Sequence, residues 1–157
     1  MSRHFLNLDG AATIATQQLL DARELVAATT EARAMAAIYG SAGTGKTFTV
    51  NEIVRDLPSE SWVHLDFRCR PTLRDIRQSL DRSMGHDGYL GAGMFEVDDK
   101  LKNILGEHPR LVVIDEAQWL NRECFEYLRH LHDDPRTQFS LLFVGGSGCY
   151  EVLRREP

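Results

Sequence analysis

The sequence predicts an α/β sandwich built on a largely parallel sheet. Two observations lead to this fold class. Short apolar runs alternate with longer segments of helical character along the chain, which is the pattern of strands joined by crossover helices. A glycine-rich loop also separates the first apolar run from the helical segment that follows it. With 157 residues, the chain is long enough for one domain with a single core.

The first three predicted elements surround the glycine-rich loop. Residues 11–34 contain mostly helix formers and neither proline nor glycine, which predicts a helix. The apolar run over 36–39 predicts a strand that ends at Gly40. After the loop, residues 47–56 predict a helix that stops before Pro58, because a residue ahead of a proline is disfavoured in a helix.

The middle of the chain predicts one strand and two helices. Residues 62–67 form the second apolar run, and Pro71 suits the first turn of a helix over 71–84. Glycines spread over residues 85–93 mark a loop. In residues 94–105, Val97 lies four residues before Leu101, and Ile104 and Leu105 lie three and four residues after it, which predicts a helix with one buried face.

The last part of the chain predicts two more strands. Residues 111–114 are a continuous apolar run, as expected of a strand that is covered on both faces. Asn121 is suited to cap a helix over 121–132. The run over 139–144 predicts the fourth strand, and a short final helix is predicted over 149–155.

Composition and charge exclude several protein classes. Hydrophobic residues make up 43% and charged residues 26%, so extensive disorder is not expected. The 18 basic and 23 acidic residues give a net charge of -5, which excludes a generally basic nucleic-acid binder. Three cysteines without a CxxC pair argue against a disulfide framework or a zinc site, so reduced thiols are expected. No apolar run reaches the roughly 20 residues of a membrane span, so the chain is predicted to be soluble and cytoplasmic, without a membrane partner.

The glycine-rich loop predicts a phosphate-binding site. Residues 40–47 read GSAGTGKT and match the pattern GxxxxGK[S/T] at every fixed position. Between a strand and a helix, such a loop curls its backbone amides around a phosphate, and the helix N-terminus adds positive charge. A glycine-rich turn with an exposed lysine is the alternative, but it does not explain the strand and helix in register. The predicted cofactor-binding residues are Gly40, Ser41, Ala42, Gly43, Thr44, Gly45, Lys46 and Thr47.

Two carboxylates are predicted to complete this site. Residues 111–116 read LVVIDE, so Asp115 and Glu116 follow an apolar strand at the edge where open α/β sheets bind ligands. Asp115 is expected to bind the nucleotide and, with the Thr47 hydroxyl, to hold Mg²⁺. Lys46 and Glu116 are the predicted catalytic residues: Lys46 would reach the β and γ phosphates, and Glu116 would orient the attacking water. An ordinary strand with an acidic turn is the alternative.

Four segments carry a resemblance to a known family. They are YGSAGTGKT, LDFRCRPTLRDIRQSLDRSMG, LVVIDEAQWL and LLFVGG. Together they resemble the AAA+ ATPases related to phage Mu transposition protein B and the TniB-type transposition helpers. The resemblance implies a three-layer P-loop NTPase fold (a RecA-like AAA+ core) over residues 35–157. Residues 1–34 are predicted to be an N-terminal helical segment packed on this core. It also implies an ATP- and Mg²⁺-dependent oligomer that self-associates through the ATP site, contacts DNA and assists a transposase.

The chain differs from this family in two ways. The family's fold has five core strands followed by an arginine finger and a helical lid, so a chain with four predicted strands resembles a core truncated before the fifth strand. In the family, a polar residue after the fourth strand senses the γ-phosphate, whereas Gly145 and Gly146 stand there in this sequence. Ser147 is the nearest hydroxyl and is predicted to bind nucleotide, and Gln118 is a partial substitute.

A basic helix face is the candidate DNA contact. Arg70, Arg74 and Arg77 are spaced four and three apart, so they are expected to share one face of the helix over 71–84. Such a face can follow a phosphate backbone. Two alternatives are that the face is simply solvated, or that its arginines pair locally with Asp75 and Asp81.

The sequence therefore predicts an ATP-binding AAA+ ATPase that assists a DNA transaction such as transposition through ATP-dependent assembly on DNA. The alternative is a nucleotide-gated interaction module, or a truncated fragment, with little or no ATP turnover. In the first case, a positive charge for the transition state is expected from a neighbouring copy's arginine.

Overall fold

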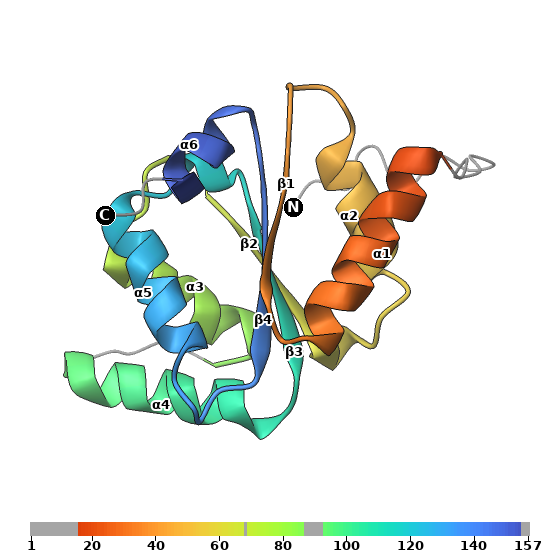
Figure 1. Ribbon diagram of the computed structural model, residues 1–157. Helices are drawn as coiled ribbons and strands as arrows, with labels where there is room; N and C mark the ends of the chain where they lie inside the picture. The colour runs from red at the N-terminus through yellow and green to blue at the C-terminus, as the bar shows by residue number, and fades with distance from the viewer. Residues whose placement is uncertain (1–15, 68, 87–92, 155–157) are drawn as a thin grey trace.

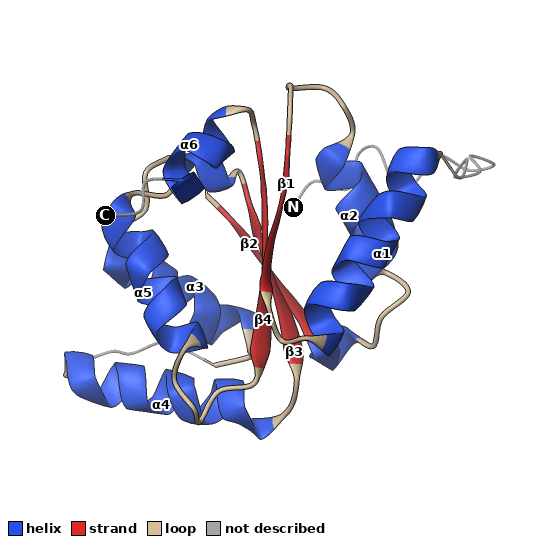
Figure 2. Cartoon of the chain, in the orientation of Figure 1, coloured by secondary structure: helices blue, strands red, loops and turns tan. Residues whose placement is uncertain are grey.

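Four parallel strands form a central sheet in the order β1-β4-β3-β2. The computed structural model describes residues 16–67, 69–86 and 93–154. Helices α1 and α2 cover one face of the sheet, and α3, α4, α5 and α6 lie on the other (Figures 1 and 2). The predicted α/β sandwich with a parallel sheet is confirmed. The strands are β1 (Met35–Tyr39), β2 (Trp62–Asp66), β3 (Arg110–Asp115) and β4 (Phe139–Gly145).

The helices follow the predicted order with shifted ends. They are α1 (Gln17–Glu31), α2 (Lys46–Val54), α3 (Leu73–Ser83), α4 (Met94–Glu107), α5 (Arg122–His132) and α6 (Gly148–Arg154), with short 3-10 turns at Ser59–Ser61 and Ala117–Trp119. The first helix ends three residues earlier than expected, and Arg33 beyond it has a left-handed φ of 49°. The predicted start of this helix, residues 11–15, lies outside the described residues.

Side-chain caps decide where two helices begin. Asn121 accepts a hydrogen bond from the backbone N–H of Cys124 at 2.8 Å, so the predicted cap of α5 is confirmed. The prediction that α3 begins at Pro71 is wrong. Thr72 and Asp75 form a reciprocal capping box, in which Thr72 accepts from the Asp75 N–H and Asp75 accepts from the Thr72 N–H. Pro71 therefore precedes the cap, and the first helical residue is Leu73.

The two inner strands are buried along their full lengths because helices cover both faces of the sheet. Alternate residues enter opposite cores. Val113 and Leu142 pack with residues of α1 and α2, whereas Ile114 and Leu141 pack with residues of α3, α4 and α5. These two cores fix the strands that carry the candidate site.

The described cysteines are all unbonded thiols, as predicted. Cys124 and Cys149 are buried, and burial raises the pKa of the Cys149 thiol to about 11, so it stays protonated near neutral pH. Cys69 is exposed. In residues 16–67, 69–86 and 93–154, none of the helices has the length and apolar character needed to span a bilayer.

Candidate nucleotide-binding site

The parallel register brings the candidate residues to one edge of the sheet. Tyr39 at the end of β1 pairs with Gly145 at the end of β4, and Asp66 at the end of β2 pairs with Asp115 at the end of β3. The loop over residues 40–45 follows β1, and the turn at Glu116 follows β3. Loops that are distant in the sequence therefore meet at the carboxyl ends of the strands, where parallel α/β sheets bind ligands.

The loop after β1 takes a conformation that requires glycine. Gly43 and Gly45 have φ angles of 80° and 77°, in the left-handed region, and Gly45 directly precedes the first turn of α2. The Lys46 ammonium donates to the carbonyl oxygens of Gly40 (3.0 Å) and Ser41 (2.7 Å) and to the Thr44 hydroxyl (3.2 Å). The loop therefore curls around the ammonium group of its own lysine.

Thr47 and Asp115 meet across 68 residues of sequence. The Thr47 hydroxyl donates to Asp115 Oδ1 at 3.3 Å, and Asp115 is only 4% exposed. Burial alone would raise the pKa of Asp115, but the nearby His64 ring, together with hydrogen bonds from the next backbone N–H and from Thr47, outweighs burial and holds this pKa below its ordinary value. Asp115 is therefore a carboxylate at neutral pH.

His64 is a neighbour of this site that the sequence did not reveal. It lies on β2, and its Nε2 is 3.6 Å from Asp115 Oδ2. Its position depends on β2 pairing with β3, and a sequence pattern does not specify which strands are adjacent. The sequence offered one signal for the position of His64: the alternation of side chains along β2 places it on the same side of the strand as Asp66.

The oxygens of Thr47 and Asp115 fit Mg²⁺. This ion is a hard cation that proteins usually bind through one or two side-chain oxygens together with phosphate and water. Across the described parts of the chain, histidine, cysteine and acidic side chains form no group of three or more that would hold a metal ion by itself. The chemistry of the pair therefore suits a metal ion that arrives with a phosphate ligand.

Glu116 is the start of a tight turn. Its φ and ψ are 54° and 37°, a left-handed conformation that is uncommon for a residue with a side chain. Its backbone N–H donates to Asp115 Oδ1 at 2.9 Å, and its side-chain Oε2 accepts a hydrogen bond from the Gln118 amide. Gln118 in turn accepts from the Gly146 N–H at 2.8 Å. The two predicted carboxylates are thus adjacent, and Gln118 ties Glu116 to the backbone directly after β4.

Two cavities adjoin the loop. The first is a cleft of about 320 Å³, and its lining residues are Ala42, Gly43, Gly45, Lys46, Thr47, Phe48, Asp115, Glu116, Gln118, Gly145 and Gly146. Most of the predicted site residues therefore share this cleft. Ser147 is exposed and is not one of the lining residues, whereas Gln118 is.

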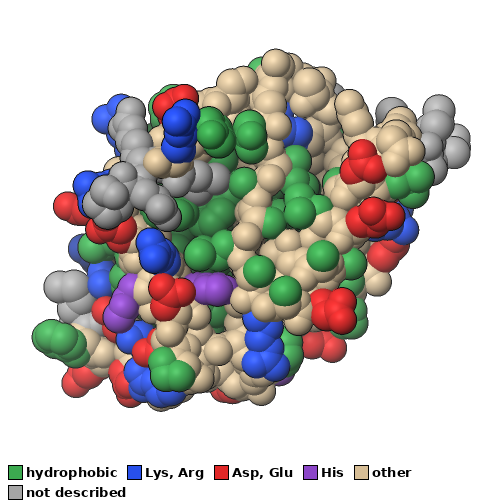
Figure 3. Space-filling view, in the orientation of Figure 1, with side chains coloured by type: hydrophobic (Ala, Val, Ile, Leu, Met, Phe, Trp, Pro, Cys, Tyr) green, Lys and Arg blue, Asp and Glu red, His purple; other side chains and the backbone are tan. Residues whose placement is uncertain are grey.

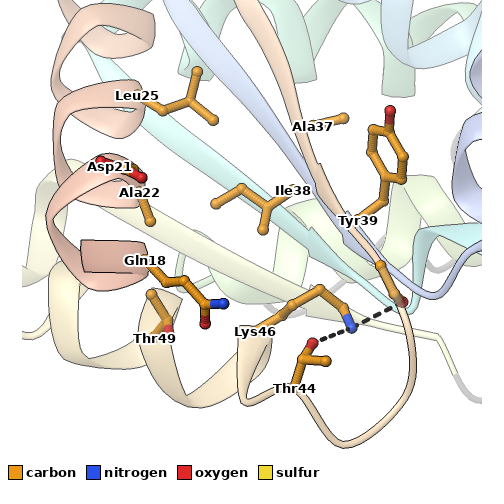
Figure 4. A pocket seen from close by; sticks show the side chains of 11 residues that line it. Gln18, Asp21, Ala22, Leu25, Ala37, Ile38, Tyr39, Thr44, Lys46 and Thr49 are labelled. Carbon is orange, nitrogen blue, oxygen red and sulfur yellow. Dashed lines mark hydrogen bonds between the residues drawn. The ribbon is translucent and has the colours of Figure 1, made fainter. Parts of the chain in front are cut away.

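The second cavity, of about 470 Å³, lies between α1 and β1. Figure 4 shows Ala22 and Leu25 of α1 and Ile38 of β1 around it, with Lys46 at the end nearer the loop. Gly40 and Thr44 also line it. Figure 3 looks onto the β1 edge of the sheet and shows hydrophobic side chains on both sides of that edge. A pocket with a mixed apolar and polar lining thus continues from the loop, and Lys46 borders both cavities.

A sequence profile with the description "AAA domain" matches residues 29–153, which contain both motifs and all four strands. The chain belongs to this AAA domain family. Comparison with curated proteins finds no match.

Solved structures show the same fold. The Pif1 helicase from Candida albicans matches with a TM-score of 0.56 at 16% identity, over 92% of this chain and 39% of the helicase. A structure of Drosophila ORC bound to GC-rich DNA and Cdc6 matches with a TM-score of 0.52 at 10% identity, over 90% of this chain and 57% of the other. This AAA domain therefore spans less than two thirds of either neighbour.

Arg70, Arg74 and Arg77 were predicted to share a helix face that is available to DNA. The prediction is wrong for Arg77, because its side chain is paired within the protein. Its guanidinium contacts both carboxylate oxygens of Asp98 on α4, at 2.7 and 3.2 Å, and lies 4.4 Å from the ring centre of Tyr127. The Arg77 side chain is only 12% exposed. Arg70 precedes the helix, and it and Arg74 are exposed. The arginine spacing in the sequence cannot reveal a partner that lies 21 residues further along the chain.

Arg77→Ala is expected to destabilise the AAA domain by about 1 to 3 kcal/mol, because it leaves the half-buried Asp98 carboxylate without its cation. Arg74→Ala, at an exposed position of the same helix, is the control and is expected to change stability by less than about 0.5 kcal/mol. Chemical denaturation measures both. Equal stability of the two variants would contradict the structural role of Arg77.

The stability lost in Arg77→Ala is expected to depend on pH. Burial alone would raise the pKa of Asp98, but hydrogen bonds from Arg77 and Tyr127 outweigh it and hold this pKa below its ordinary value. A lowered pKa in the folded state stabilises the fold above the unfolded pKa of about 3.9, and this stabilisation is lost as pH falls through the folded value. The difference in the free energy of unfolding between wild type and Arg77→Ala should therefore become smaller in acid.

Proposed function

We propose that this AAA domain binds ATP with Mg²⁺ and hydrolyses it during a DNA transaction. One observation carries the proposal: Lys46 of the phosphate loop, the Thr47–Asp115 pair and Glu116 line a single cleft. A nucleotide-dependent rise in thermal stability in the presence of Mg²⁺ tests the binding step.

The two cavities suit the two ends of a nucleotide. The cleft that holds Lys46, Thr47 and Asp115 is polar and takes the phosphates and the metal ion. The neighbouring pocket between α1 and β1 has an apolar part formed by Ala22, Leu25 and Ile38, and this pocket takes the nucleoside. Because Lys46 borders both, it lies where the phosphate chain passes from one cavity to the other.

The side chains have separate roles in hydrolysis. Lys46 exchanges its hydrogen bonds to loop carbonyls for bonds to phosphate oxygens and stabilises their charge. Thr47 and Asp115 hold Mg²⁺, which neutralises charge on the phosphates when it is bound. Glu116 accepts a hydrogen bond from the attacking water and orients it.

The nucleoside position can be tested with two leucines of α1. Leu25 lines the pocket and is 38% exposed, whereas Leu20 is 46% exposed and is not among the lining residues. Leu25→Trp is expected to fill part of the pocket and to weaken ATP binding by about tenfold or more, with Leu20→Trp as the matched control. Inorganic triphosphate, which has no nucleoside, should bind both variants like wild type in calorimetry. Equal ATP affinity of the two variants would contradict the assignment of this pocket.

A DNA transaction is the proposed setting. The structural neighbours are a helicase and an origin recognition complex bound to DNA, and the sequence resembles transposition helpers. Transposition, with a transposase as partner and self-association of this chain through its ATP site, is the specific form that we propose. The exposed Arg70 and Arg74 are the candidate contacts to the phosphate backbone.

The DNA contact predicts a salt dependence. Each phosphate contact contributes about 0.9 units to the slope of log K against log salt. Arg70→Gln with Arg74→Gln should therefore flatten the slope by up to about two units and leave ATP binding unchanged. Arg122→Gln, at an exposed position on α5, is the control. The titration is done with an ATP analogue at concentrations where the protein self-associates. An unchanged slope in the double variant would rule out these contacts.

A second candidate function is a nucleotide-gated interaction module with little turnover. Among the residues that the structure describes, Lys46 is the only cation that lines the phosphate cleft. Phosphoryl transfer commonly needs a further positive charge, often an arginine, for fast turnover. If no second copy supplies it, ATP would control assembly without being consumed at a useful rate.

A further inference from the structure

The end of β4 is shaped to receive a side chain from another segment. A Cβ at Gly145 would lie 2.6 Å from Gln118 Oε1 and 2.9 Å from the Cβ of Cys149. Any larger residue at position 145 must therefore displace the Gln118 side chain, α6 or both. The glycine leaves room for Gln118, whose side chain occupies the position next to the strand end.

Gln118 uses both of its polar atoms in this position. Its oxygen accepts from the backbone N–H of Gly146 at 2.8 Å, and its amide nitrogen donates to Oε2 of Glu116. The first bond fixes the orientation of the amide, because only the oxygen can accept from a backbone N–H. The nitrogen then faces Glu116 and donates to its carboxylate.

Glu116 needs this support because of its surroundings. It is exposed, and its backbone has the left-handed conformation of a tight turn. An exposed glutamate has several accessible rotamers, whereas orienting a water molecule requires one carboxylate position. Its carboxylate accepts a hydrogen bond from Gln118, which is itself anchored to the backbone of Gly146, directly after the buried strand β4.

We propose that Gln118 is a positioning residue for ATP hydrolysis: it links the end of β4 to the Glu116 carboxylate and holds that carboxylate at the phosphate cleft. Gly145 contributes by having no side chain, because a Cβ at this position would collide with the Gln118 amide. The inference rests on the proposed function for its effect on turnover. The link itself is a property of the nucleotide-free protein.

Two substitutions of Gln118 separate positioning from packing. Gln118→Ala removes both hydrogen bonds and is expected to lower kcat about tenfold, while the affinities for ATPγS and ADP stay within about twofold of wild type. Gln118→Glu has the same shape and keeps the acceptor for Gly146, but it faces Glu116 with a second carboxylate. It should lose as much turnover as the alanine variant, whereas a packing role alone would leave it active.

Substitution of the glycine tests the same link from β4. Gly145→Ala should lower kcat, and it should lower kcat by less in the Gln118→Ala background, where only the contact with Cys149 remains, than it does in wild type. Gly148→Ala is the matched control, because a Cβ there meets Gln118 at an ordinary contact distance of 3.7 Å. Additive losses in the double variant would overturn the proposed link. A fall in ATPγS affinity but not ADP affinity in Gln118→Ala would also overturn it, since Gln118 would then bind the γ-phosphate directly.

An NMR measurement on the nucleotide-free protein does not depend on turnover. The side-chain amide signal of Gln118 is expected to move when Glu116→Ala removes its acceptor, and to move in Gly145→Ala, but to stay in place in Gly148→Ala. An unchanged signal in Glu116→Ala would overturn the inference even in a chain that hydrolyses ATP. Failure of wild type to bind ATP, with the amide signal behaving as expected, would instead count against the proposed function alone.

Discussion

Lys46→Ala is expected to abolish ATP binding, with a loss of at least about 100-fold in affinity. Within residues 16–67, 69–86 and 93–154, the ammonium is the only positive side chain that lines the phosphate cleft, and it also borders the pocket assigned to the nucleoside. Its removal leaves the negative charge of the phosphates without a side-chain partner from the protein. Calorimetry with Mg²⁺ and ATPγS measures the affinity of wild type and variant.

The control for Lys46→Ala is a measurement of whether the variant still folds. The Lys46 ammonium donates its hydrogen bonds within the loop, to Gly40, Ser41 and Thr44. The variant is therefore expected to unfold within a few degrees of wild type in the absence of nucleotide. A folded variant with wild-type nucleotide affinity would show that the loop is not the binding site.

Glu116→Gln is expected to lower ATP turnover by about 100-fold or more while nucleotide binding is retained. The amide keeps the size of the side chain but cannot accept a proton as the carboxylate does. Thr47 and Asp115, which are proposed to hold the metal ion, are unchanged. Steady-state phosphate release, with and without duplex DNA, measures the effect.

The outcome of Glu116→Gln separates the two candidate functions. A clear wild-type rate that falls in the variant supports the hydrolytic function. A flat baseline in both proteins, with tight ATP binding, supports the nucleotide-gated module. A substantial rate that is equal in the two proteins would show that another group activates the water and would contradict the role of Glu116.

Much of the fold could be predicted because its signals are local. The alternation of apolar runs and helical segments, together with the cap at Asn121, depends on residues that are close in sequence. The start of α3 was predicted wrongly because two local signals compete. Pro71 is suited to a first helical turn, but the paired side chains of Thr72 and Asp75 form a capping box one residue later.

The candidate site could be predicted in part. Lys46, Thr47, Asp115 and Glu116 belong to two contiguous motifs, and the structure places them in one cleft. Contacts that depend on which strands and helices are neighbours were not visible in the sequence. They include the approach of His64 to Asp115, the bond from Gly146 to Gln118, and the pairing of Arg77 with Asp98.

A crystal structure of the chain with Mg²⁺ and a non-hydrolysable ATP analogue tests the central claim most directly. The account predicts phosphates enclosed by the loop over residues 40–47, with Lys46 moved from its carbonyl partners onto phosphate oxygens. It also predicts the metal ion at Thr47 and Asp115, and the nucleoside between α1 and β1. A nucleotide bound elsewhere, with Lys46 still hydrogen-bonded to Gly40 and Ser41, would contradict it.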